Sequence, residues 1–263
     1  MKVVHDCLGE MELKVPPERV VSLAPSVTDA LFYLGMGARV VGRSAFCWRP
    51  PEAEKLPVVS SYTKVRWDLL EALEPDLVFT TTAVQRDANQ EFRERGYNVW
   101  PVPLPNTPWG IIENLGVVAA FMGVDASELQ AALAARYLRQ RNRFLGLTYY
   151  FEFDLGGPIT IGRASYVAAA LAHLGMKNVL DRPEAYFPPP GPPPADVDLF
   201  IYEPKRIKNR EAQLAAARGR AEELGLSGVP LVVTGGDELA HFGPLFFDYF
   251  EAFADQVARA AGR

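Results

Sequence analysis

Apolar and polar residues follow the same order in the two halves of this chain. A short apolar run, at residues 20–23 and again at 158–161, precedes a loop that contains a serine. Apolar residues at helical spacing come next, and the two segments are nearly alike, since residues 30–36 read ALFYLGM and residues 170–176 read ALAHLGM. This pattern predicts a strand, a loop and a helix that are built twice.

The serine in each loop is expected to cap the helix that follows it. Ser26 precedes Asp29 by three residues, which is the spacing of a capping box, in which the hydroxyl accepts a free backbone N–H and the carboxylate reaches back. Ser165 can cap the second helix in the same way. Gly35 and Gly175 follow the two apolar stripes and predict left-handed helix ends.

A second pair of segments continues the parallel. Residues 75–79 and 196–200 are continuous apolar runs, typical of strands that are buried on both faces of a parallel sheet. A helix-forming stretch follows each run, and a further apolar run comes at 99–102 or 229–233. Each half is therefore expected to hold about four strands that alternate with helices.

A polar, alanine-rich stretch separates the halves. Residues 125–145 predict one long helix, and about 20 residues would span about 30 Å, so we expect a stiff bridge and little motion of the lobes. The predicted fold class is α/β, with two lobes, each a parallel sheet flanked by helices, joined by one long backbone helix. The expected boundaries are 1–107 for the N-terminal lobe, 108–145 for the helical connection and 146–263 for the C-terminal lobe.

Composition narrows the function. The 27 basic and 32 acidic residues give a net charge of −5, with no basic block suited to nucleic acid. No window approaches the about 20 apolar residues of a membrane span, so the chain is not expected to cross a membrane. Charged residues occur from the second position onward, and the N-terminal segment has no apolar stretch as long as that of a signal peptide. We expect a cytoplasmic protein as the sequence is written, or a periplasmic or cell-surface one if it is a processed form.

Two stretches carry a resemblance to a known family. Residues 18–29 read ERVVSLAPSVTD and residues 73–78 read LEPDLV, with weaker support from GRASY at 162–166 and NVL at 178–180. In order and spacing they resemble the helical-backbone class of substrate-binding proteins for metal chelates, a class III periplasmic-binding-protein-like family. Its members serve ABC importers of cobalamin, ferric siderophores and haem. The resemblance implies a solute-binding protein with no built-in cofactor and no catalytic residues.

The resemblance and the fold class both place the ligand in the cleft between the lobes, at the carboxyl ends of the strands. Aromatic rings there suit the flat faces of a corrin, porphyrin or catecholate, and arginine or lysine can pair with the negative charge of a chelate. The candidate ligand-binding residues of the first lobe are Pro25, Ser26, Phe46, Trp48, Tyr62, Lys64, Thr82 and Gln85. Those of the second half are Tyr150, Arg163, Tyr166, Tyr186, Glu203, His241 and Phe242.

Several candidates have a structural alternative. Tyr150 lies in an aromatic run at 149–151 that could be a strand of the second lobe, and Lys64 could simply be solvated. His241 could cap the metal of a corrin or haem, or could be a structural residue of a turn. A site for a bare metal ion is not expected, because the histidines are few and scattered over the chain.

Two other functions stay open. One is a cytoplasmic sensor or store of the chelate that has no transporter. The other is an α/β enzyme that acts on a small molecule, which is less favoured because the sequence contains no G-x-G-x-x-G, G-x-x-x-x-G-K-[ST] or G-x-S-x-G motif.

Docking to a transporter is a separate expectation. The resemblance implies an acidic residue on each lobe that docks to arginines of the ABC membrane subunits. Asp87 is the candidate in the first lobe, whereas the second lobe carries basic residues within 205–210, which would oppose such docking.

Overall fold

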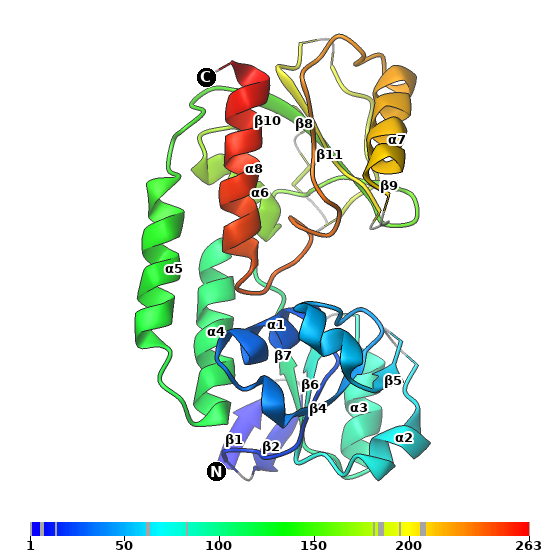
Figure 1. Cartoon of the computed structure of the whole chain (residues 1–263), viewed down its shortest axis with the longest axis vertical. Coiled ribbons are helices and arrows are strands. Elements are labelled where there is room, and N and C mark those ends of the chain that lie inside the picture. The colour runs from blue at the N-terminus through cyan, green and yellow to red at the C-terminus, as the bar shows by residue number, and fades with distance from the viewer. Residues whose placement is uncertain are drawn as a thin grey trace. The chain divides into compact units, whose positions relative to one another are not determined.

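The computed structural model describes residues 2–5, 8–13, 15–61, 64–82, 84–180, 182–183, 187–194, 196–205 and 209–262 (Figure 1). The chain divides into two compact units. Unit 1 consists of Met1–Leu104, Trp109–Leu133 and Phe242–Leu245, and unit 2 consists of Pro105–Pro108, Ala134–His241 and Phe246–Arg263. Each unit holds a largely parallel sheet with helices, so the predicted α/β class with two lobes is confirmed.

Unit 1 is built on a five-stranded parallel sheet with the strand order β5-β4-β3-β6-β7. Its strands are β3 (Val20–Ser22), β4 (Val40–Ser44), β5 (Val58–Ser60), β6 (Leu77–Thr81) and β7 (Val99–Val102). The helices are α1 (Pro25–Tyr33), α2 (Trp67–Ala72), α3 (Arg86–Glu94) and α4 (Pro108–Met122), with short 3-10 turns η1 (Gly37–Arg39) and η2 (Pro51–Lys55). An antiparallel hairpin of β1 (Lys2–His5) and β2 (Gly9–Glu12) precedes the sheet in the chain. The central strands β3 and β6 are buried throughout, as continuous apolar runs predict.

Unit 2 repeats this arrangement with fewer strands. Parallel strands follow the order β10-β8-β11-β12, and β9 pairs antiparallel with β8. The strands are β8 (Thr148–Asp154), β9 (Pro158–Ile159), β10 (Lys177–Asn178), β11 (Leu199–Glu203) and β12 (Leu231–Val233). The helices are α6 (Tyr166–His173), α7 (Arg210–Glu223) and α8 (Phe246–Ala261).

The strand order of the two sheets contains the predicted repeat, but one strand of the second copy is a different segment from the one expected. The order β4-β3-β6-β7 in unit 1 matches β10-β8-β11-β12 in unit 2, with α1 and α6 in corresponding places. The strand that corresponds to β3 is β8, and not the run at 158–161. Only Pro158 and Ile159 of that run form a strand, because Gly156 and Gly157 turn the chain back along β8.

The two helix starts differ from each other. Ser165 is the N-cap of α6 and accepts a hydrogen bond from the backbone N–H of Ala168, as expected. The capping box at Ser26 is wrong, because Pro25 is already the first residue of α1 and no side chain caps that helix. Proline favours this first helical position, since it has no N–H to satisfy and its φ is already helical. Asp29 instead accepts a hydrogen bond from the backbone N–H of Leu245 at 2.8 Å.

The connecting helix α5 (Ser127–Arg139) is shorter than expected, and turns follow it to residue 146. The amides of Asn142 and Phe144 donate to the carbonyls of His173 and Leu174 at the end of α6, so they are lost to a continuing helix. Unit 1 includes α4 and the first half of α5, which the sequence placed in a separate connection. Within the described ranges, no helix has both the length and the apolar character needed to cross a membrane.

Candidate functional site

A buried amide closes the carboxyl end of the unit 1 sheet. Gln85 is 1% exposed, and its Oε1 accepts hydrogen bonds from the N–H of Thr81 at 2.9 Å and from the hydroxyl of Thr81 at 3.2 Å. Its Nε2 donates to the carbonyl of Leu23 at 3.3 Å, and Asn89 Nδ2 donates to the carbonyl of Thr81 at 2.9 Å. Gln85 therefore ties the ends of β6 and β3 together, and protein groups already occupy both ends of its amide.

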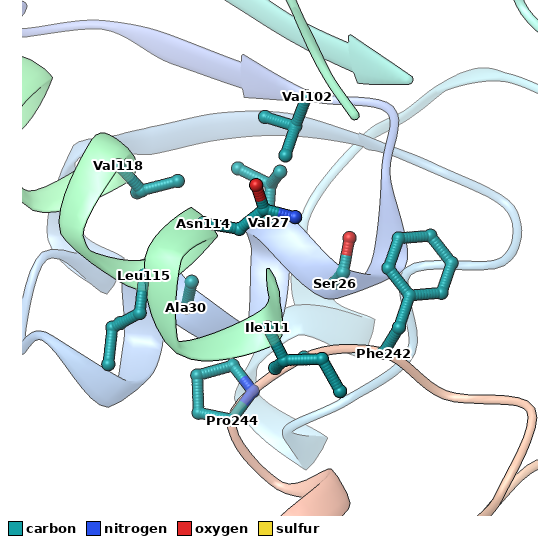
Figure 2. Close-up of a pocket in the computed structure, with 11 residues that line it drawn as sticks. Ser26, Val27, Ala30, Val102, Ile111, Asn114, Leu115, Val118, Phe242 and Pro244 are labelled. Atoms are coloured by element: carbon teal, nitrogen blue, oxygen red, sulfur yellow. The ribbon is translucent and has the colours of Figure 1, made fainter. Parts of the chain in front are cut away.

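Ser26 lies in the first turn of α1 and lines a small cavity within unit 1 (Figure 2). Its side chain is buried, at 6% exposed, and its hydroxyl has no hydrogen-bond partner among the described residues. Phe242 and Asn114 also line the cavity, which has a volume of about 10 Å³. That volume suits about one water molecule and excludes a chelate, so the cavity itself is not the ligand site.

The loop after β4 presents two aromatic rings on either side of a buried cysteine. The thiol of Cys47 donates to the carbonyl of Ser22 at 3.5 Å and lies 3.1 Å from the hydroxyl of Ser44, and burial raises the pKa of that thiol. Phe46 is 50% exposed, and Trp48 is half-buried with the guanidinium of Arg49 4.1 Å from its ring centroid. Cys47 therefore anchors the loop, and the rings beside it face outward at least in part.

The remaining candidates of unit 1 differ in exposure. Lys64 is exposed, Pro25 and Thr82 are half-buried, and the backbone N–H of Thr82 donates to the carbonyl of Val102. Asp87 is exposed in the first turn of α3. Tyr62 lies outside the described residues.

Two aromatic candidates of unit 2 lie in its interior. The Tyr150 hydroxyl is 2.6 Å from a carboxylate oxygen of Glu152 and 3.0 Å from the carbonyl of Gly191. The Tyr166 hydroxyl donates to the carbonyl of Leu239 at 2.7 Å, and its ring meets that of Phe246 edge to face. Both side chains are fully buried, so they act as core residues that hold loops in place.

Glu203, at the carboxyl end of β11, is a fully buried carboxylate that holds the loop after β12. It accepts hydrogen bonds from the backbone N–H groups of Leu239 at 2.8 Å and Ala240 at 2.7 Å, and from the hydroxyl of Thr234 at 3.0 Å. Burial raises the pKa of Glu203 to about 7, although these hydrogen bonds act in the opposite direction. Its role in this structure is therefore to position the segment that leads to His241.

The last candidates are spread over both units. His241 is buried, with its ring centroid 6.4 Å from that of Tyr249, whereas Phe242 is half-buried and belongs to unit 1. Arg163 has an exposed side chain, and its backbone N–H donates to the carbonyl of Arg182. Tyr186 lies outside the described residues.

The sequence candidates omitted two residues that shape these loops. Arg49 stacks on Trp48, and its place directly after an aromatic residue in a proline-rich loop was the available signal. Asn89 of α3 follows Gln85, the N-cap residue of that helix, by four residues, a spacing that puts both amides on the same side of the helix.

Residues 20–192, about two thirds of the chain, match the family described as periplasmic binding protein. The chain belongs to the periplasmic binding protein family. The resemblance to this family that was read from the sequence is thereby confirmed.

Curated relatives of this family member share limited stretches with it. A vitamin B12-binding protein of Pectobacterium carotovorum is 42% identical over 62 residues, which cover 24% of this chain and 22% of that protein. A vitamin B12-binding protein of Vibrio campbellii is 24% identical over 184 residues, which cover 66% of this chain and 65% of that protein. The chain thus spans less than two thirds of the length of either relative.

Solved structures show the same fold over nearly the whole chain. The periplasmic vitamin B12 binding protein BtuF of Vibrio cholerae has a TM-score of 0.77 at 19% identity, covering 95% of this chain and 100% of that one. The apo periplasmic heme-binding protein RhuT of Roseiflexus has a TM-score of 0.77 at 21% identity, covering 93% of this chain and 99% of that one. At this identity the likeness shows the family's fold.

Proposed function

We propose that this chain binds a metal chelate as the solute-binding component of an ABC-type uptake system, and that the chelate is a corrinoid. The observation that carries the proposal is the loop after β4, where Phe46 and Trp48 flank the buried Cys47. Flat rings that are held at a strand end by a buried anchor suit a planar macrocycle. The names of the curated relatives, which bind vitamin B12, support a corrinoid over other chelates.

The proposed ligand contacts include fewer residues than the candidates drawn from the sequence. Phe46 and Trp48 offer ring faces, and the exposed Lys64 offers positive charge to carboxylate or amide groups on the rim of the ligand. Gln85, Tyr150, Tyr166 and Glu203 are assigned to positioning, because protein groups already occupy their polar atoms.

The test is calorimetric titration of the purified protein with cyanocobalamin, cobinamide, haem and a ferric catecholate siderophore. We expect saturable binding of the two corrinoids, and a loss of about tenfold or more in affinity with Trp48→Ala. Saturable binding of haem alone would be consistent with a metal-chelate ligand but would overturn the proposal that this ligand is a corrinoid. Binding of none of the four would overturn the proposal.

A second tryptophan serves as a control that distinguishes loss of a ligand contact from loss of protein stability. Trp67 also has an arginine 4.1 Å from its ring centroid, that of Arg95, but its ring packs on Phe92 in the core of unit 1. Ligand-dependent quenching of fluorescence should be lost in Trp48→Phe and kept in Trp67→Phe. The reverse result would remove Trp48 from the contact set.

Docking to a transporter is tested separately from ligand binding. Asp87 is exposed in the first turn of α3, and Asp68 is an exposed aspartate in the first turn of α2 that serves as its control. Asp87→Lys should weaken binding to the reconstituted membrane subunits of the transporter, whereas Asp68→Lys should not. Corrinoid binding without any association with the membrane subunits would favour a sensor or store of the chelate.

A further inference from the structure

The terminal strand of the unit 2 sheet, β12, has one open edge. Among the described strands β12 pairs only with β11, in a register that places Val233 opposite Tyr202. The backbone N–H of Thr234 donates to the carbonyl of Tyr202 at 3.2 Å. Because successive residues of a strand point their backbone groups to opposite edges, those of Leu231 and Val233 face away from β11.

The corresponding strand of unit 1, β7, is closed at the same position. Pro101 lies opposite Thr80 of β6, as Val233 lies opposite Tyr202 of β11. Proline has no N–H to offer, and the carbonyl of Pro101 is 3.0 Å from Nε2 of His5. Proline and a covering side chain are common ways to prevent a further strand from joining a sheet. Unit 2 has a valine here, so its edge keeps the donor.

Only part of the β12 edge is covered by the protein itself. The guanidinium of Arg210 donates to the carbonyl of Val233 at 2.7 Å and to that of Thr234. Within the part of the chain that the structure describes, no hydrogen bond reaches the N–H or carbonyl of Leu231, or the N–H of Val233. Two donors and one acceptor therefore stay open along this edge.

A groove of about 450 Å³ runs beside these open groups. It is lined by residues of α7, β12 and α8, all within unit 2. Leu214, Leu231, Val233 and Ala260 make its apolar part. An extended peptide with apolar residues at alternate positions could cover this part while its backbone faces β12.

Three arginines line the groove. Arg210 already donates to the carbonyls of Val233 and Thr234, and the other two carry the charge offered to a partner. Arg218 of α7 and Arg259 of α8 line it, are exposed, and form no ion pair with any described residue. Two other arginines of unit 2 are paired with carboxylates, since Arg143 meets Asp255 and Arg220 meets the buried Glu152. A partner with negative charge is therefore favoured over a neutral or basic one.

We propose that the β12 edge binds an extended acidic segment of a partner protein by strand addition. The backbone of the segment pairs with the open groups of Leu231 and Val233, and its carboxylates pair with Arg218 and Arg259. This surface belongs to unit 2 alone and does not depend on which ligand the protein carries, so its failure would leave the proposed function untouched.

The test uses a fluorescein-labelled octapeptide of alternating valine and glutamate, with the valine–lysine octapeptide as its comparison. Fluorescence anisotropy at low salt should show saturable binding of the acidic peptide only. Val233→Pro copies the closed edge of unit 1 and should weaken that binding about tenfold or more. The double reversal Arg218→Glu with Arg259→Glu should abolish it, whereas the control reversal Lys55→Glu with Arg86→Glu, at exposed positions of unit 1, should not.

Amide hydrogen exchange on the unaltered protein gives a second readout that needs no variant. The N–H groups of Leu231 and Val233 should exchange rapidly in the free protein and become protected when the acidic peptide is added. Equal binding of both peptides, or binding without protection of these two amides, would overturn strand addition. Absence of binding of the acidic peptide would overturn the site.

Discussion

The two units share a strand order but stabilise the carboxyl ends of their sheets with different chemistry. At the end of β6, the neutral amide of Gln85 both accepts and donates, so one side chain joins two strands. At the end of β11, which has the same place in its sheet, the carboxylate of Glu203 only accepts and gathers three donors from the loop after β12. The same skeleton therefore has a pH-independent clamp in unit 1 and an ionisable one in unit 2.

The largest effect should come from removing the ionisable clamp. Glu203→Leu leaves the N–H groups of Leu239 and Ala240 and the hydroxyl of Thr234 without their acceptor in a buried place. We expect the free energy of unfolding of unit 2 to fall by about 4 kcal/mol. Hydrogen exchange of the β11 amides measures this loss.

The control for that change is Glu222→Leu, at an exposed position of α7, which should alter the free energy of unfolding by less than about 0.5 kcal/mol. A loss below about 1 kcal/mol for Glu203→Leu would mean that the loop finds other acceptors. The expected difference between the contributions of Gln85 and Glu203 to stability would then be contradicted.

The pH dependence of stability should differ between the units. The pKa of Glu203 is about 7 in the folded protein and near 4.5 when unfolded, so the folded state holds the proton more tightly. The stability that this pKa difference contributes to the folded state is fully present below pH 4.5. As the pH rises through 7, the free energy of unfolding falls by about 3 kcal/mol. Exchange of unit 2 amides between pH 4.5 and 7.5 should show this loss, and Glu203→Gln should remove it. An unchanged slope in that variant would assign the pH dependence to another group.

Unit 1 offers the converse experiment, because all four tryptophans lie in it and fluorescence reports its unfolding alone. Gln85→Leu should lower the free energy of unfolding by about 2 kcal/mol at every pH, since it leaves the N–H of Thr81 and the carbonyl of Leu23 unpaired. Gln85→Glu should be tolerated at low pH, where the protonated acid can donate to Leu23, and should become destabilising as the pH rises. Urea titrations at pH 5 and pH 8 measure both variants, and Gln90→Leu on the exposed face of α3 is the control.

The repeat, the parallel sheets and the loops at the strand ends followed from the sequence because apolar runs report burial directly. The end of α5 did not, since it depends on carbonyls of α6 that accept from Asn142 and Phe144 across some 30 residues of chain. Tyr150 was assigned to the ligand for a similar reason. Its partner Glu152 is itself held by Arg220, and that pairing over 68 residues leaves no local pattern.

The serine at each helix start shows how one neighbour changes a local rule. Both serines follow a strand and precede an apolar stripe, so the same cap was expected of each. Pro25 moves the start of α1 two residues toward the N-terminus, which places Ser26 inside the helix with its hydroxyl toward a small cavity. The proline is visible in the sequence, and its preference for the first helical position was the signal that could have separated the two cases.

The smallest effect should separate these two serines. Ser165→Ala removes a cap and should lower the free energy of unfolding of unit 2 by about 1 kcal/mol, because the N–H of Ala168 loses its acceptor. Ser26→Ala removes a buried hydroxyl that has no partner among the described residues, so unit 1 should lose less than about 0.5 kcal/mol or become slightly more stable. Hydrogen exchange measures the first and fluorescence-detected urea unfolding the second. A loss of about 1 kcal/mol in Ser26→Ala would show that its hydroxyl is satisfied in solution, and the volume of the cavity makes one bound water the partner that could do so.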